Sequence, residues 1–196
     1  MPPVTQSLLI ANIAVYLLEN YLGGRFIDMF ALWPPSMPYF QPWQMVTYGF
    51  LHGGIGHIFF NTLALYMFGS DIERLFGSRF FLQFYFACLI SAAITHLVVT
   101  GWMGAPPVPT IGASGAIFGI LLAFGWYFPQ RRVLLLILPI PLPARVFVAL
   151  YGAFELYFGI TQTMSGVAHF AHLGGMLGGW LMIQWRRQGF PFNRRR

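Results

Sequence analysis

Long apolar runs, separated by polar or proline-rich segments, make up most of this chain. A helix needs about 20 mostly apolar residues, in a range of about 17 to 25, to cross a bilayer. Backbone groups in lipid must pair within their own segment, so such runs are expected to be helices. Six runs qualify or nearly do: 6–23, 51–70, 79–100, 114–129, 144–162 and 167–185. The pattern predicts an all-α, polytopic membrane protein, with six transmembrane helices in one compact domain over residues 1–196.

Two further apolar segments are predicted to be connectors rather than spans. Residues 24–50 are rich in aromatic residues and proline, so we expect this first outer connector to lie partly submerged in the headgroup region. Residues 133–143 are short and interrupted by three prolines, including Pro139, which favours a connector near the interface. The first run has no basic segment before it and no clear cleavage site, so we expect a retained span rather than a signal peptide.

Composition supports a membrane location. The chain is 57% hydrophobic and 8% charged, whereas soluble domains carry about 25% charged residues. The net charge of +6 comes from 11 arginines, which cluster at the ends of apolar runs. Membrane orientation explains them better than nucleic-acid binding does, so no nucleic-acid partner is expected. Cys88, the one cysteine, is expected to be a small buried hydrophobe.

The arginines also predict an orientation. Six spans place both termini on one side, and ten of the 11 arginines then share that side, leaving only Arg25 opposite. The positive-inside bias predicts that both termini are cytoplasmic, in the inner membrane of a prokaryote. The basic end "QWRRQGFPFNRRR" (184–196) is expected to bind anionic membrane lipid.

Polar side chains inside apolar runs are costly, so each is a functional candidate. Spans two, four and six would all start on the outer side. The fourth run has about 16 residues and spans about 24 Å, less than the roughly 30 Å of the hydrocarbon core, so its start is expected to lie below the outer surface. A shared depth predicts one site. The candidates are His52, His57, Asn61, Ser114, His169 and His172, with His96 near the end of the third run.

Glycine pairs suggest how these residues meet. Gly175 and Gly179 share a helix face with His172, and such a pair lets another backbone approach closely. The fourth run carries its own pair beside Ser114, at positions 115 and 119. His169 lies one turn before His172 and is an alternative partner for the serine, although the glycine face favours His172.

A serine beside an imidazole has the chemistry of a nucleophile and its general base. Glu155 lies in the middle of the fifth run and is expected at a different depth, so the residues predict a Ser–His dyad rather than a triad. His57, Asn61 and the Ser114 backbone N–H are candidate oxyanion donors. No histidine spacing is convincing for a metal, and no cofactor is expected.

Each of these residues also has a structural interpretation. Ser114 between glycines is, taken alone, more often a packing residue. Asn61 and His57 could bridge helices, and His96 is expected to be structural. His52 and His169 could meet interfacial water or handle substrate or water. The catalytic interpretation therefore depends on Ser114, His172, His57 and Asn61 taken together.

Three motifs give the chain a resemblance to the rhomboid family of intramembrane serine proteases. "GASGAIFG" (112–119) resembles the family's nucleophile motif, "HGGIGHIFFN" (52–61) its second-span pattern, and "AHLGGMLGG" (171–179) its sixth-span motif. The resemblance implies that Ser114 is the nucleophile and that His172, rather than His169, is the base.

The resemblance implies further roles and shows two departures. His57 and Asn61 match the oxyanion residues, His52 the histidine before them, and Gly112 the glycine two before the nucleophile. Glu73 resembles a structural acid. Gln44 stands where many members have arginine, and Phe118 stands where some have a tyrosine beside the base.

The sequence thus predicts an endopeptidase that cleaves transmembrane segments of membrane proteins. The resemblance implies lateral substrate access near the fifth span and a preference for helix-destabilising sequences and small residues. A non-catalytic rhomboid-like binding protein or chaperone is the alternative. A histidine-lined transporter is disfavoured because "LALYMF" (63–68) and "ILLAF" (120–124) are almost wholly apolar.

Overall fold

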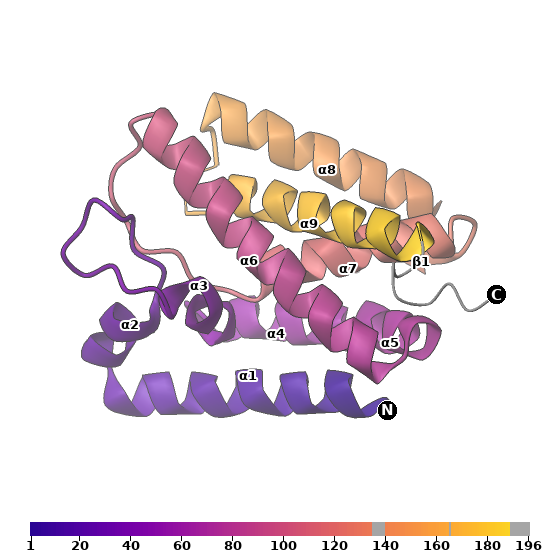
Figure 1. Cartoon of the computed structure of the whole chain (residues 1–196), viewed down its shortest axis with the longest axis horizontal. Helices are drawn as coiled ribbons and strands as arrows, with labels where there is room; N and C mark the ends of the chain where they lie inside the picture. Colours follow the sequence, from indigo (N-terminus) through magenta and orange to yellow (C-terminus); the bar gives the residue numbers. More distant parts are fainter. Residues whose placement is uncertain (135–139, 165, 189–196) are drawn as a thin grey trace.

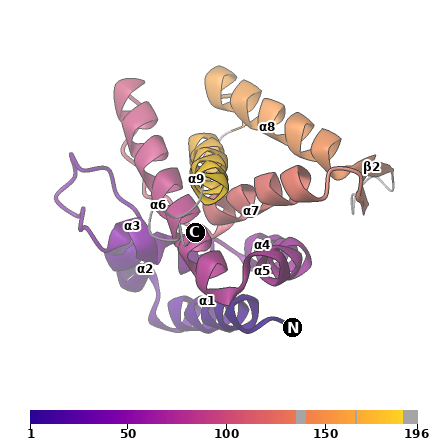
Figure 2. The same cartoon turned by 45° about the vertical axis from the view of Figure 1, so that its right-hand side comes forward.

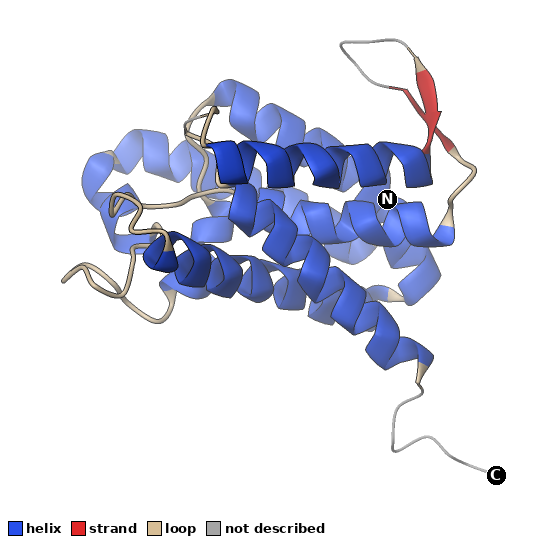
Figure 3. Cartoon of the chain, turned by 90° about the horizontal axis from the view of Figure 1, so that it is seen from above, coloured by secondary structure: helices blue, strands red, loops and turns tan. Residues whose placement is uncertain are grey.

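The computed structural model describes residues 1–134, 140–164 and 166–188, and these are mainly helical. Two short strands pair antiparallel at one end, where Figure 3 shows them in red. Figure 1 shows the order of the elements along the chain. The elements are α1 (Pro3–Leu22), α2 (Gly24–Phe30), α3 (Gln44–Thr47), η1 (Tyr48–Phe50), α4 (Ile55–Ala64), η2 (Leu65–Gly69), α5 (Ser70–Phe76), α6 (Ser78–Trp102), α7 (Ser114–Tyr127), β1 (Arg132–Leu134), β2 (Pro141–Pro143), α8 (Ala144–Thr161) and α9 (His169–Arg187).

Helix α9 occupies the centre of one half of the bundle. It packs against α6, α7 and α8, and Figure 2 shows it almost end-on between them. The segments α4, η2 and α5 follow one another without a break and separate α7 from α1. The start of α1 and the end of α9 lie at the same end of the molecule (Figure 1), as an even number of crossings requires.

The helical architecture is confirmed, while the count of six spans stays a prediction. By length and apolar composition, α6 and α8 are the two described helices able to cross a membrane, and α7 is a shorter apolar helix. Helix α7 has 14 residues and begins at Ser114, in agreement with a short fourth run. The second run is divided by the π-helical turn η2, and α9 carries two histidines at its start, which lowers its apolar character.

The two predicted connectors differ in structure. Residues 133–143 hold most of the β1–β2 pair, but residues 135–139, including Pro139, lie outside the described residues. The lipid-binding role predicted for the chain end falls on 184–196, of which 189–196 also lie outside them. The first connector contains α2, α3 and η1, and it is held together by Gln44.

Gln44 is fully buried and binds four backbone groups of the first connector. Its Nε2 donates to the carbonyls of Met29 and Tyr39 at 3.2 and 2.9 Å. Its Oε1 accepts from the N–H groups of Trp33 and Gln41, both at 3.2 Å. One neutral amide therefore offers both donors and acceptors here, which an arginine could not do because its guanidinium only donates.

The core is built from aromatic and aliphatic side chains of α6, α7 and α9, among them Phe81, Phe84 and Ile120. Cys88 is fully buried, as predicted. A Cβ built on Gly119 would overlap its Sγ, so α6 and α7 approach closely at this point.

Glu73 joins three segments at the end of the bundle where α1 starts. Its carboxylate accepts from the N–H groups of Val4 and Thr5 at 2.9 and 2.6 Å. It also accepts from the hydroxyls of Thr5 and Ser78, each at 2.7 Å. Four donors to one buried carboxylate match the structural role that the resemblance implies for this acid.

Candidate active site

The close contact between α7 and α9 depends on the two glycine pairs. A Cβ on Gly175 would overlap the carbonyl oxygen of Gly115, and one on Gly179 would lie 3.0 Å from that of Gly119. The two helices therefore meet through glycine backbones, as the spacing predicts. This contact brings the first residue of α7 beside the first turn of α9.

Ser114 and His172 meet at this contact. The Ser114 Oγ lies 2.7 Å from the His172 Nε2, within hydrogen-bond distance. The imidazole of His172 is buried and stacks on the ring of Phe118, with centroids 4.1 Å apart and planes 5° from parallel. Phe118 thus orients the imidazole through ring stacking, without the hydroxyl of a tyrosine.

The structure places Glu155 beside His172, so the predicted depth of this acid was wrong. Its Oε2 lies 2.9 Å from the His172 Nδ1, although the sequence places this acid at a different level. The predicted fifth run (144–162) and α8 (Ala144–Thr161) nearly coincide, but the prediction treated Glu155 as central although it lies past the middle of the helix. Glu155 is therefore about 9 Å from the end of its helix nearest α9. The carboxylate is buried, and the contact is close but off-axis, since the Nδ1 makes no well-directed hydrogen bond.

His169 holds the same carboxylate oxygen from the other side. Its Nδ1 lies 2.6 Å from the Glu155 Oε2, and its Nε2 lies 3.2 Å from the carbonyl oxygen of Met164. The ligand atoms of Glu155, His169 and His172 lie within 4.8 Å of one another. In the described part of the chain, these three could hold a metal ion, although the sequence predicted no metal site. The hydrogen bond between Glu155 and His169 already pairs these two groups without one.

The loop before Ser114 is shaped around His57. Gly112 has a φ of 126°, which side chains rarely adopt, and a Cβ there would lie 2.8 Å from the His57 Nε2. The Gly112 N–H donates to the Tyr48 carbonyl at 2.9 Å. Thr110 pairs with Leu32 of the first connector through two backbone hydrogen bonds of 2.9 Å. A glycine at 112 therefore brings the imidazole of His57 close to the loop before Ser114.

The tautomer of His57 follows from its neighbour. The His57 Nδ1 accepts from the Gly53 N–H at 3.3 Å. In the neutral ring the other nitrogen, Nε2, then carries the proton. This Nε2 is the atom that lies against Gly112, so a donor faces the loop that leads into Ser114.

Asn61 lies one turn beyond His57 on the same face of α4. Its side chain is buried, and its Nδ2 has no hydrogen-bond partner in the described structure. A buried amide donor without an acceptor is costly and calls for an explanation. Here the free donor is suited to an oxygen that gains negative charge during a reaction.

His52 and His96 have structural partners. The His52 Nδ1 lies 3.2 Å from the Phe50 carbonyl oxygen, and its ring meets that of His57 edge-on at 5.0 Å. The His52 N–H donates to both carboxylate oxygens of Glu19, at 3.1 and 3.2 Å. The His96 Nε2 lies 2.8 Å from the Thr110 Oγ1. His52 therefore packs against His57, and His96 bonds to the loop that precedes Ser114.

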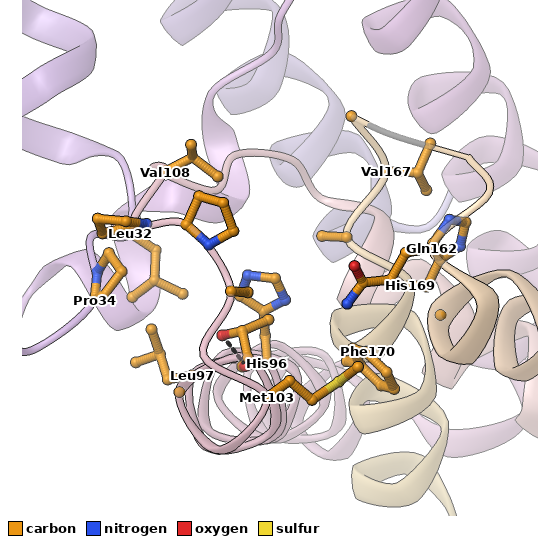
Figure 4. A pocket seen from close by; sticks show the side chains of 18 of the residues that line it. Leu32, Pro34, His96, Leu97, Met103, Val108, Gln162, Val167, His169 and Phe170 are labelled. Atoms are coloured by element: carbon orange, nitrogen blue, oxygen red, sulfur yellow. Dashed lines mark hydrogen bonds between the residues drawn. The ribbon is translucent and has the colours of Figure 1, made fainter.

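A cavity of about 490 Å³ lies between the end of α6, the segment after it and the start of α9. Figure 4 shows His96 in its centre, with Leu32 on one side and His169 on the other. Gln162 and Thr100 add further polar groups to its wall. His169 therefore connects this hollow to Glu155, and through Glu155 to His172.

Comparison with known proteins decides the family. Residues 39–188 match the Rhomboid domain. The chain belongs to the rhomboid family. Rhomboid proteins are membrane-embedded, and the match includes all three motifs that carry the resemblance, from His52 to Gly179.

Several curated rhomboid proteins are similar to this chain. Rhomboid protease GluP of Bacillus subtilis is 36% identical over 137 residues, covering 70% of this chain and 24% of that protein. RHOMBOID-like protein 12, mitochondrial, of Arabidopsis thaliana is 31% identical over 189 residues, covering 88% of this chain and 55% of that protein. Rhomboid protease GlpG of Photorhabdus laumondii is 27% identical over 195 residues, covering 98% of this chain and 65% of that protein. The chain thus spans less than two thirds of the length of each.

Proposed function

We propose that this rhomboid protein is an intramembrane serine endopeptidase that cleaves transmembrane segments of other membrane proteins. The observation that carries the proposal is the 2.7 Å contact between the Ser114 Oγ and the His172 Nε2. Relatives named rhomboid proteases support the same reaction class.

The proposed reaction begins with attack of the Ser114 Oγ on a substrate carbonyl carbon. His172 takes the hydroxyl proton at Nε2 and then gives it to the departing amine as the C–N bond breaks. A water molecule, deprotonated by the same imidazole, hydrolyses the remaining ester and restores Ser114. The Phe118 ring stacked on His172 limits tilting of the base through both steps.

The tetrahedral intermediate carries an oxyanion that needs fixed donors. The Asn61 Nδ2 and the His57 Nε2 supply two, since the first is unpartnered and the second faces the nucleophile loop. The backbone N–H of Ser114 is a third, because N–H groups in the first turn of a helix have no partner within that helix. Gly112 admits the His57 ring, and His52 supports it from behind.

The membrane arrangement belongs to the same proposal. Six spans would place both termini on the cytoplasmic side of a prokaryotic inner membrane, with the catalytic serine nearer the outer side. The start of α1 and the end of α9 at one end of the bundle support an even count. Exposed aromatic residues of α8, including Phe154 and Tyr157, suit a lipid-facing surface past which an unwound substrate segment could enter. The hollow beside His96 and His169 is a route for the water that hydrolysis consumes.

Substitution of the dyad tests the proposal. Purified protein in liposomes should cleave a transmembrane substrate and react covalently with a fluorophosphonate at Ser114. Ser114→Ala should abolish both, and His172→Ala should abolish cleavage. Ser7→Ala is a matched control, because Ser7 is exposed on α1 and its hydroxyl bonds only to its own helix. Cleavage retained by Ser114→Ala would refute the nucleophile, and an inactive wild type would favour the non-catalytic binding protein or chaperone.

A further inference from the structure

Two imidazoles share one carboxylate oxygen at the contact of α8 and α9. The Oε2 of Glu155 lies 2.6 Å from the His169 Nδ1 and 2.9 Å from the His172 Nδ1. All three side chains are buried. A tertiary link between two helices needs only one of these contacts, so the second calls for its own explanation.

His169 fixes the position of the carboxylate. Each of its ring nitrogens faces an oxygen acceptor, one on Glu155 and one on the Met164 backbone. The orientation of the ring is therefore set by two contacts rather than one. Glu155 is held in place before any substrate arrives.

His172 presents its two nitrogens to different groups. Its Nε2 faces the Ser114 Oγ, which leaves the proton of the neutral ring on Nδ1. That Nδ1 lies beside the carboxylate, off-axis, in a buried position with no other acceptor among the described residues. Catalytic hydrogen bonds are often poorly aligned without substrate and tighten during the reaction.

We propose that Glu155 is a positioning residue that acts through His172, and that His169 holds Glu155 for this task. The proposal rests on the proposed protease function and replaces the predicted dyad with a chain of four groups. Glu155 selects the tautomer with the proton on Nδ1 and stabilises the imidazolium formed when the serine proton reaches Nε2. The Nδ1 proton stays on His172, and Glu155 remains a carboxylate throughout.

The test is Glu155→Gln, which keeps the shape of the side chain and removes its charge. Loss of the carboxylate from a Ser–His–Asp site lowers kcat by about 10⁴, and we expect a fall of about 10²–10⁴ here. KM should stay unchanged, because Glu155 acts through the base rather than through substrate binding. Fluorophosphonate labelling of Ser114 should slow in parallel, and its end point counts the folded sites.

Glu73→Gln is the matched control. It removes another buried, hydrogen-bonded carboxylate at the opposite end of the bundle, so it should lower the melting temperature and leave kcat per labelled site unchanged. If Glu155 were merely structural, the two variants would behave alike, and the proposal would be overturned. Wild-type kcat in Glu155→Gln would also overturn it while leaving the protease function intact, provided that Ser114→Ala is inactive in the same assay.

Discussion

Asn61 shows how a single side chain can be interpreted from its missing partner. Its Nδ2 is buried and unbonded among the described residues, a cost that a purely structural asparagine would avoid by facing an acceptor. A substrate oxyanion would supply that acceptor during the reaction only. The amide would then contribute to the transition state more than to substrate binding.

Asn61→Ala should therefore slow cleavage rather than stop it. Removal of one oxyanion donor costs about 10²–10³ in kcat, while KM should change little. Steady-state kinetics on a transmembrane substrate measures both. An unchanged kcat would exclude Asn61 from the oxyanion site and leave it a helix-packing residue.

At this scale the sequence pointed to individual residues, while their partners depend on the fold. Motif and spacing both pointed to Ser114 and His172, whose side chains lie 2.7 Å apart. Glu155 was misplaced because it was taken as central in its run, whereas it lies nearer the end of α8 that precedes α9. The signal available was an acid in an apolar run together with the pair His169 and His172, one turn apart.

Among the elements, the α7–α9 contact decides whether Ser114 and His172 meet. Gly175 sits against the Gly115 carbonyl with no room for a methyl group. The two glycine pairs made this contact predictable, since small residues four apart permit close backbone approach. The irregular loop before Ser114 was not predictable, because the positive φ of Gly112 depends on where His57 lies.

Gly175→Ala should push α7 and α9 apart. Overpacking of this kind costs about 1–3 kcal/mol of unfolding free energy, occasionally more, and cleavage should fall because the Oγ–Nε2 distance grows. Gly56→Ala is the control, since a Cβ there has nothing within 4 Å. Denaturant unfolding in detergent and a cleavage assay measure the two effects. Equal stability and activity in both variants would show that the glycine contact is not needed.

Across the whole molecule, Glu73 ties the start of α1 to α5 and α6, at the end of the bundle opposite the site. It lies outside the predicted spans, after the apolar run 51–70. Burial raises the pKa of this carboxyl, but hydrogen bonds from Ser78, Thr5 and Val4 outweigh burial, and the net pKa is lowered from 4.5.

Glu73 should therefore make stability depend on acid pH. A lowered folded-state pKa gives stabilisation that is present above the unfolded value, near 4.5, and lost as pH falls through the folded value. Melting temperatures measured from neutral pH down to acid pH should drop over this window in the wild type. The melting temperature of Glu73→Gln should be lower than that of the wild type at neutral pH and should fall less as the pH decreases. Parallel curves for the two proteins would show that Glu73 does not provide this dependence.

The burial of the one thiol in the chain is useful for labelling experiments on the whole bundle. Cys88 is fully enclosed between α6 and α7 and pressed against Gly119, where a maleimide has no path to it. The natural chain should thus give no background with such reagents. New cysteines could be introduced on the exposed face of α8 and labelled one at a time, so spectroscopic probes could report on that helix without first removing a native sulfur.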